Sequence, residues 1–428
     1  MSDNTNRIKT HSILGFLMLL NILSMVDRNL LSSFGPQIVE DLQLTDSQFG
    51  LLTGMIFVFF YAVMGLFMGV LVDRFHRPRI IAAGLLIWSV LTAFSGIAKS
   101  FAQIAMARIM VGVGESSLTP ASLSMLSDLF PQRKRGMAAG IYYLGVPLGA
   151  GGSFLAAGLL GPILGWRNCF LLLGALGIVL AIPLFIMRDP KRGSQDAIQE
   201  TEAVEKSSLA DLWQYLLNSP ALMLTMAGAV FLHIPIGGGQ FALLWLVRER
   251  GFAPAEIATL YGVLFMIFGT LGSLFGGMAS DWFQARFAGG RVRFLAIVML
   301  VMTPLLVGYR FSAPDSPIFY VGMCTGFLLM SIFYGPAFST VQDLTPSHMR
   351  GRMVALLLVA CNLIGLGLGA VLTGFLSDML RTSGSEQPLT WALLTTDIIS
   401  LLTVPSFIWA SIYIARQQKK EHIAGGLK

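Results

Sequence analysis

Charge and cysteine are both scarce in this chain of 428 residues. Only 12% of the residues are charged and 55% are hydrophobic, which excludes a soluble protein with one core because its surface would lack charge. The 3 cysteines, Cys169, Cys324 and Cys361, stand alone in apolar sequence, and their spacing excludes a metal site or a redox pair. We interpret them as small apolar side chains that fill space, and we expect no cofactor and no metal.

Apolar runs of about 20 residues recur along the chain, and each is long enough to cross about 30 Å of hydrocarbon as a helix. They predict an all-α membrane protein with twelve spans, at 12–35, 48–72, 80–98, 101–126, 137–160, 168–188, 219–247, 256–280, 292–311, 317–340, 353–378 and 389–415. The first run contains Asp27-Arg28 and lacks a small-residue cleavage pattern, so we expect a span there rather than a signal peptide.

Most of the 29 Lys and Arg residues fall in alternate loops, on the side that also carries both termini. Because positively charged loops stay in the cytoplasm, both termini are predicted to be cytoplasmic. The net charge of +6 then reflects topology and contact with membrane lipids, and we expect no nucleic-acid partner.

Two pairs of segments show that the chain is duplicated. The stretch Asp128-Leu-Phe-Pro-Gln-Arg-Lys-Arg135-Gly136 returns as Asp343-Leu-Thr-Pro-Ser-His-Met-Arg350-Gly351. Gly69-x-x-x-Asp73 returns at nearly the same separation as Gly277-x-x-x-Asp281. Two similar halves in a bilayer indicate a transporter.

A polar segment divides the spans into six and six. We predict an N-terminal six-helix bundle at 12–188, a cytoplasmic linker at 189–218 and a C-terminal six-helix bundle at 219–416, with the halves related by a pseudo-two-fold axis. Within the linker, Ser208-x-x-Asp211 is typical of a helix start. The residues that follow predict a short amphipathic helix in the membrane interface, with its apolar face formed by Leu209, Leu212, Trp213, Leu216 and Leu217.

The loop after the second span, Gly69-x-x-x-Asp73-Arg74-x-x-Arg77, together with the twelve spans resembles the major facilitator superfamily. Three shorter motifs are similar to those of its Spinster group: Val26-Asp27-Arg28, Asp46-Ser47-x-x-Gly50-Leu51-Leu52, and the run from Val111 to Ser117. The Asn-Tyr pair usual before the Asp-Arg is here Ser24-Met25. The resemblance implies a monomeric transporter in a bacterial inner membrane, and the group is associated with lysolipids and sphingoid phosphates.

Four charged residues lie inside predicted spans: Asp27, Arg28, Arg108 and Glu115. An ionised side chain near the bilayer midplane costs at least about 2.5 to 3.5 kcal/mol, so each needs a reason to be there. Arg108 and Glu115 are two helical turns apart and therefore project from the same face of the fourth span, where they can interact directly or through water. In the superfamily fold, Asp27 would lie close to them.

We predict that Asp27 and Glu115 exchange protons during transport, with Arg108 favouring the ionised carboxylate and desolvation favouring the neutral one. The alternative is a static ion-pair network that joins the first and fourth helices. Arg28 is a candidate for binding an anionic headgroup nearer the membrane edge, and Arg108 and Glu115 are also candidate substrate contacts.

His233 in the seventh span and Asp397 in the twelfth are further candidates. His233 could bind substrate or simply hydrogen-bond a neighbour, and Asp397 could pair with the hydroxyl of Thr395, Thr396 or Ser400. Pro235 and the glycines at 237–239 interrupt the helix around His233, which predicts either a gate or a packing kink.

The duplicated loops are candidate gate elements. By the family resemblance, Asp73 contacts the N-terminal end of the eleventh helix and latches the inner gate, since free N–H groups there attract carboxylates. Asp128 with Arg135, and Asp343 with Arg350, are predicted to be charged posts at the equivalent loops. The candidate gate and latch residues are Gly69, Asp73, Arg74, Arg77, Asp128, Arg135, Asp281, Asp343 and Arg350.

The function predicted from these features is proton-coupled secondary active transport of an amphipathic, lipid-like solute by alternating access. The alternatives are a polar organic anion such as a sugar acid, or a multidrug-type antiporter. No nucleotide-binding, metal or nucleophile-base pattern indicates an enzyme. A channel needs rings of repeated charge or carbonyls, whereas the charges predicted inside the bilayer are confined to the N-terminal half.

Overall fold

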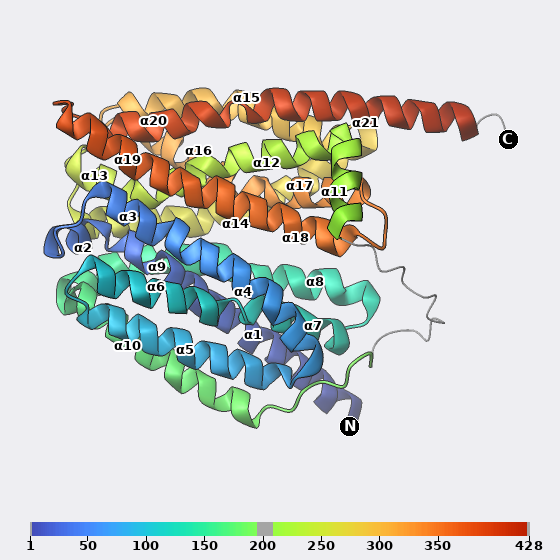
Figure 1. Cartoon of the computed structure of the whole chain (residues 1–428), viewed down its shortest axis with the longest axis horizontal. Coiled ribbons are helices and arrows are strands. Elements are labelled where there is room, and N and C mark those ends of the chain that lie inside the picture. Colours follow the sequence, from blue (N-terminus) through green and yellow to red (C-terminus); the bar gives the residue numbers. More distant parts are fainter. Residues whose placement is uncertain (1, 195–208, 426–428) are drawn as a thin grey trace. The chain divides into compact units, whose positions relative to one another are not determined.

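The computed structural model describes residues 2–194 and 209–425, and these ranges contain helices but no strand (Figure 1). All twelve predicted spans appear as helices. Ten helices in the described ranges are long and apolar enough to cross a membrane. The fourth and fifth spans are each built from two shorter helices, because turns at Ser116–Ser117 and Leu144 divide them. The prediction of an all-α fold is confirmed.

The chain forms two compact units. The first contains the described residues up to 194 together with Gln240–Met266, and the second contains 209–239 and 267–425. The helices of the first unit are α1 (Ser2–Ser33), α2 (Gly35–Asp41), α3 (Asp46–Thr53), α4 (Met55–Arg74), α5 (Arg77–Ile97), α6 (Phe101–Glu115), α7 (Leu118–Leu129), α8 (Gln132–Tyr143), α9 (Gly145–Leu159), α10 (Gly161–Ile186), α13 (Ala242–Arg248) and the beginning of α14 (Pro254–Arg286). In this unit α5 packs along α10 and α1 along α9.

The second unit contains the rest of α14 and the linker helix. Its other helices are α11 (Leu209–Asn218), α12 (Pro220–Gly238), α15 (Gly290–Phe311), α16 (Pro317–Ile332), α17 (Tyr334–Asp343), α18 (Arg350–Ala360), η2 (Cys361–Gly367), α19 (Leu368–Thr382), α20 (Pro388–Ser400) and α21 (Thr403–Gly425), and the short 3-10 turn η1 (Gly239–Phe241) links α12 to α13. Proline occupies the first helical positions of α12, α16 and α20, where its missing N–H costs nothing.

Large apolar side chains cover the outside of the spans as well as the inside. Ile163, Ile186 and Met278 are exposed, along with many other aliphatic and aromatic residues. A soluble protein rarely exposes apolar patches on this scale, so hydrocarbon must be the solvent of this surface.

The amphipathic linker helix predicted near Asp211 is present as α11, and its apolar face is buried on one side only. Leu212 and Leu216 are buried in the core of the second unit, whereas Trp213 and Leu217 are exposed. The helix is held by the Tyr215 hydroxyl, which donates to the carbonyl of Leu344 at 2.7 Å.

Candidate functional site

Two carboxylates and two guanidinium groups meet inside the first unit. Asp27 and Arg28 come from α1, and Arg108 and Glu115 come from α6. Asp27, Arg108 and Glu115 are at most 2% exposed, whereas the side chain of Arg28 is 23% exposed. The structure therefore brings together all four charges that the sequence placed inside spans, and only Arg28 among them reaches an open surface.

Arg28 is the ion-pair partner of Glu115. Its Nη2 lies 2.9 Å and its Nε 3.3 Å from Glu115 Oε2, which also accepts a hydrogen bond from the Ser24 hydroxyl at 3.1 Å. Glu115 Oε1 has no hydrogen-bond partner among the described residues. From the sequence, Arg108 was expected near Glu115 and Arg28 nearer the membrane edge. In the structure the ion pair joins Arg28 of α1 to Glu115 of α6.

Arg108 is held by α1 and by an aromatic ring. Its Nη2 donates to the carbonyl of Arg28 at 3.2 Å, and it interacts electrostatically with Asp27 and Glu115. Its guanidinium carbon lies 4.7 Å from the centre of the Phe57 ring, and that of Arg28 lies 4.9 Å from the same ring and 4.5 Å from Tyr61. Phe57 thus contacts the guanidinium groups of both Arg28 and Arg108, and the electron-rich face of its ring attracts their positive charge.

Asp27 is bound by a hydroxyl from a third helix. Thr92 in α5 places Oγ1 2.8 Å from each carboxylate oxygen of Asp27. Nothing in the sequence predicted that Thr92, Phe57 and Tyr61 belong to this site. A threonine or an aromatic residue within an apolar run has nothing to distinguish it from its neighbours.

Two glycines explain how α6 reaches this position. A Cβ at Gly112 would lie 2.8 Å from the carbonyl oxygen of Phe57, and one at Gly114 would lie 2.7 Å from that of Gly84. Any larger residue at either place would push α6 away from α4 or α5. The run from Val111 to Ser117 therefore sets the helix contacts that bring Glu115 to α1.

His233 lies in the second unit, in α12. It is 2% exposed, its Nδ1 lies 2.9 Å from the carbonyl oxygen of Ala229, and its ring packs edge-on against Phe333 and Tyr334. The helix continues through Pro235 and ends at Gly238, where η1 begins. The predicted interruption is present, and the substrate role of His233 stays a prediction.

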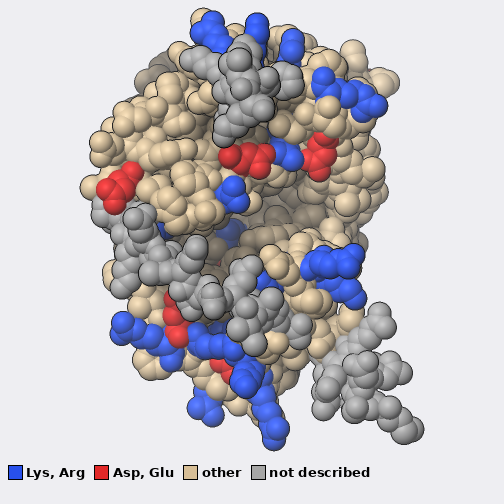
Figure 2. All heavy atoms as spheres, turned by 90° about the vertical axis from the view of Figure 1, so that its right-hand side faces the viewer, with Lys and Arg blue, Asp and Glu red and all other residues tan. Residues whose placement is uncertain are grey.

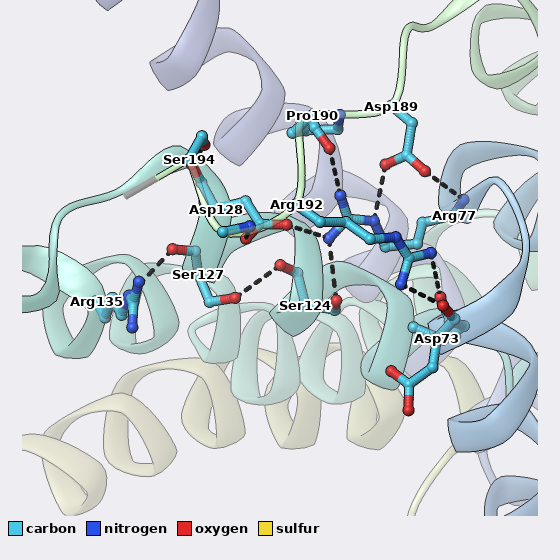
Figure 3. Close-up of polar contacts among 12 residues, drawn as sticks. Asp73, Arg77, Ser124, Ser127, Asp128, Arg135, Asp189, Pro190, Arg192 and Ser194 are labelled. Carbon is cyan, nitrogen blue, oxygen red and sulfur yellow. Dashed lines mark hydrogen bonds and ion pairs between the residues drawn. The ribbon is translucent and has the colours of Figure 1, made fainter. Parts of the chain in front are cut away.

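Arg77 is the centre of a polar network at the loop after the second span (Figure 3). It is fully buried, its Nε lies 2.7 Å from Asp189 and its Nη1 2.5 Å from Asp128. Nη1 also donates to Ser124, and Nη2 donates to the carbonyl of Pro190. Arg135, the other predicted charged post of this loop, donates to the carbonyls of Ser127 and Phe130, and the gate role of Asp128 and Arg135 stays a prediction.

Asp73 and its neighbours are exposed at the same loop. Arg192 donates to the Asp73 carbonyl, and among the described residues the Asp73 carboxylate makes no hydrogen bond or ion pair (Figure 3). Arg74 is also exposed, and a Cβ at Gly69 would meet no heavy atom within 4 Å. The latch assigned to Asp73 therefore stays a prediction.

The duplicated loop of the second unit repeats the arrangement of Arg77 with Asp128. Arg291 forms an ion pair with Asp343, and its Nη2 lies 3.0 Å from Asp281. Arg350 donates to the Thr345 carbonyl five residues earlier, as Arg135 does to Phe130. In both units the aspartate of the duplicated loop is paired with an arginine from a preceding helix start, and the gate role of Asp343 and Arg350 stays a prediction.

Replacing Arg77 with Lys is expected to destabilise the protein by about 1–3 kcal/mol, because an ammonium cannot reach two carboxylates and a carbonyl in the fixed geometry of a guanidinium. Thermal unfolding of the purified protein would measure the loss. Arg79→Lys is the matched control, since Arg79 is exposed two residues away. Equal melting temperatures for the two variants would contradict the role given to Arg77.

The second unit also contains a buried ion pair that the sequence did not predict. Arg310 Nε lies 2.9 Å from Asp397 Oδ2, and the two side chains are 8% and 5% exposed. The hydroxyls predicted to pair with Asp397 instead donate to backbone carbonyls: Thr395 to Trp391, Thr396 to Leu393 and Ser400 to Asp397 itself. The expectation that buried charge is confined to the N-terminal half is wrong.

Helices that span a membrane, in a duplicated chain with acids and bases buried among them, define a membrane transporter. The model of the Major Facilitator Superfamily matches residues 17–370, and the chain belongs to that family. Its relatives are transporters and not enzymes, so the sequence predictions of family and of a non-enzyme are confirmed.

The crystal structure of a bacterial homologue of the human lysosomal transporter Spinster, in an inward-facing and unoccupied conformation, is similar, with a TM-score of 0.86 and 25% identity over 95% of this chain and 98% of that one. An MFS-type efflux pump of Mycolicibacterium smegmatis is 28% identical over 92% of this chain and 90% of its own. A hexuronate transporter of Bacillus subtilis is 26% identical over 86% and 88%.

Proposed function

We propose that this protein is a proton-coupled secondary transporter of an amphipathic, lipid-like anion, such as a lysolipid or a sphingoid phosphate, and that it works by alternating access. The observation that carries the proposal is the pairing of Arg28, which is 23% exposed, with a fully buried Glu115. A substrate anion that binds Arg28 competes with Glu115 for the same guanidinium. Glu115 then loses its ion-pair partner in a buried site and takes up a proton, so substrate and proton occupancy become linked.

The surroundings of Arg28 favour an amphipathic substrate. Its guanidinium lies over Phe57 and Tyr61, so an anion bound there has aromatic surface beside it. The similarity to a sphingosine-1-phosphate transporter of Xenopus tropicalis, which is 24% identical over 89% of this chain and 76% of its own, supports a sphingoid phosphate. The similarity to a hexuronate transporter supports a second candidate, a sugar acid, and the similarity to an efflux pump supports a multidrug-type antiporter.

Uptake into proteoliposomes would test the proposal. Radiolabelled lysophosphatidylethanolamine, sphingosine phosphate and glucuronate would be compared with and without an imposed pH difference. Transport of either lipid that depends on the pH difference and is lost in Arg28→Gln supports the proposal, and transport of glucuronate alone favours the second candidate. Arg167→Gln is the matched control, because Arg167 is partly exposed and pairs with Asp41 outside the site.

The proposal includes the placement of the protein in the membrane. Figure 2 shows many Lys and Arg side chains on the face that it draws. In the sequence, Lys and Arg are concentrated in the loops on the side predicted to be cytoplasmic, which include both copies of the duplicated loop. This charge distribution supports cytoplasmic termini. The proposal also places the protein in a bacterial inner membrane as a monomer, and the similarity to bacterial transporters supports the membrane assignment. Cysteine labelling from either side of intact cells at position 421 would test the orientation.

Replacing Asp73 with Asn is expected to slow turnover by about two- to fivefold, which corresponds to the loss of a carboxylate at a helix N-terminus. The proposal assigns Asp73 to the inner gate, so its charge matters for cycling and not for folding. Initial rates of uptake, with melting temperature as the control for folding, would measure the effect. Wild-type rates in Asp73→Asn would refute the latch.

A further inference from the structure

We infer that Thr92 is a positioning residue of the coupling site, whose hydroxyl serves Asp27 in both of its protonation states. The inference rests on the proposed function, in which Asp27 gains and loses a proton. Thr92 belongs to none of the motifs in the sequence. It is 1% exposed, on α5, and faces α1.

The hydroxyl of Thr92 lies among three acceptors. Its Oγ1 is 2.8 Å from Asp27 Oδ1, 2.8 Å from Asp27 Oδ2 and 2.9 Å from the carbonyl oxygen of Trp88. In the described part of the chain, it is the one N–H or alcohol O–H group that donates a hydrogen bond to Asp27. A hydroxyl has a single proton and two lone pairs, so it cannot satisfy all three acceptors at once.

This arrangement suits two states without moving any heavy atom. When Asp27 is ionised, Thr92 donates its proton to the carboxylate. When Asp27 takes up a proton, the new carboxylic O–H donates to Thr92 Oγ1, and the hydroxyl proton of Thr92 turns to the Trp88 carbonyl. Every polar group keeps a partner in both states, which avoids the cost of an unsatisfied buried group.

The other charged groups around Asp27 are Glu115 and Arg108 from α6, and Arg28 beside it on α1. Arg108 acts on Asp27 through its charge, and Glu115 acts through its charge and through a hydrogen bond between the two carboxyl groups. Thr92 differs from both because it is a neutral donor, whose hydrogen bond is stronger to the ionised form of Asp27 than to the neutral one. Removing the hydroxyl therefore makes Asp27 hold its proton up to higher pH.

A merely structural threonine provides the matched control. Thr225 in α12 is fully buried, and its hydroxyl donates to the carbonyl of Ala221 at 2.7 Å, with no carboxylate beside it. Thr225→Val removes the same hydroxyl from the same kind of backbone contact. A difference between the two valine variants would isolate the effect of Thr92 on Asp27.

Infrared titration of the protein in lipid nanodiscs would test the inference without a substrate. The pH-dependent C=O band of protonated carboxyl groups would be recorded for wild type, Asp27→Asn, Thr92→Val, Thr92→Ser and Thr225→Val. The part of this band that disappears in Asp27→Asn belongs to Asp27. In Thr92→Val it is expected to titrate about one to two pH units higher, a shift that corresponds to the loss of one hydrogen bond to a charged group. Thr92→Ser and Thr225→Val are expected to titrate as wild type does.

Two failures are distinguishable. An Asp27 component that titrates at the same pH in Thr92→Val and in wild type overturns the role of Thr92 and leaves the proposed function standing. If no titrating band disappears in Asp27→Asn, Asp27 does not exchange a proton in this pH range. That result would contradict the role of Asp27 in the proposed function. If Thr92→Val does not fold, Thr92→Ala removes the same hydroxyl without adding volume and gives the same test.

Discussion

Replacing Glu115 with Gln is expected to abolish accumulation driven by a pH difference, with a loss of about 100-fold or more in the proton-dependent rate. The amide matches the carboxylate in size and still accepts hydrogen bonds from Ser24 and Arg28, so the local packing is kept. It carries no charge and binds no proton, so it cannot exchange a counter-charge for a proton when a substrate occupies Arg28. Uptake into proteoliposomes with and without an imposed pH difference would measure the loss.

The decisive comparison is between driven uptake and exchange. Counterflow of substrate at equal pH needs binding and alternating access but no proton, so it is expected to survive in Glu115→Gln. Glu40→Gln is the matched control, because Glu40 lies exposed in α2 of the same unit. An unchanged dependence on the pH difference in Glu115→Gln would remove Glu115 from the coupling mechanism.

The fold was predictable because its signals are local. A span is defined by about 20 consecutive apolar residues, and proline marks where α12, α16 and α20 begin. The breaks inside spans were not predictable in the same way. Gly145 and Pro147 beside Leu144 permit a break in that span, but such residues also occur inside unbroken spans, as Pro235 does in α12. The π-helical turns at η2 lie against α12.

The candidate site was predictable in its members but not in its pairings. The cost of burying charge singles out Asp27, Arg28, Arg108 and Glu115 from the sequence alone. Which arginine reaches Glu115 depends on the rotation of α1 against α6, and spacing along one helix contains no such information. Gly112 and Gly114 fix α6 against α4 and α5, and thereby only the side of α6 that faces α1.

The same reasoning accounts for the charge pairs that were not predicted. Arg77 lies at the cytoplasmic end of a predicted span, where positive charge is expected from topology, and Arg310 lies at the opposite end of another span, where its head group could reach water. Neither position therefore indicates a buried partner. In the structure each is buried against carboxylates from distant segments. An arginine at a span end can set topology and also join two helices, and only tertiary contacts distinguish these cases.

Replacing Arg310 with Met is expected to lower the free energy of unfolding by about 3–5 kcal/mol, because it leaves the Asp397 carboxylate buried without its counter-charge. Asp397 lies in α20 and is 4% exposed, and Arg310 lies in α15. The carboxylate of Asp397 accepts a hydrogen bond from Arg310 Nε. The loss therefore falls on the contact between two helices of the second unit. Chemical unfolding of the protein in detergent would measure it.

The double variant Arg310→Met with Asp397→Leu separates the cost of an unpaired charge from the worth of the pair. Replacing a buried ion pair by apolar side chains of similar volume is often close to neutral, so the double variant is expected to recover most of the stability lost in Arg310→Met. Arg293→Met, on the exposed side of the same helix, is expected to change little. If Arg310→Met unfolds as wild type does, the pair contributes nothing to the second unit, and Asp397 must be neutral in the folded protein.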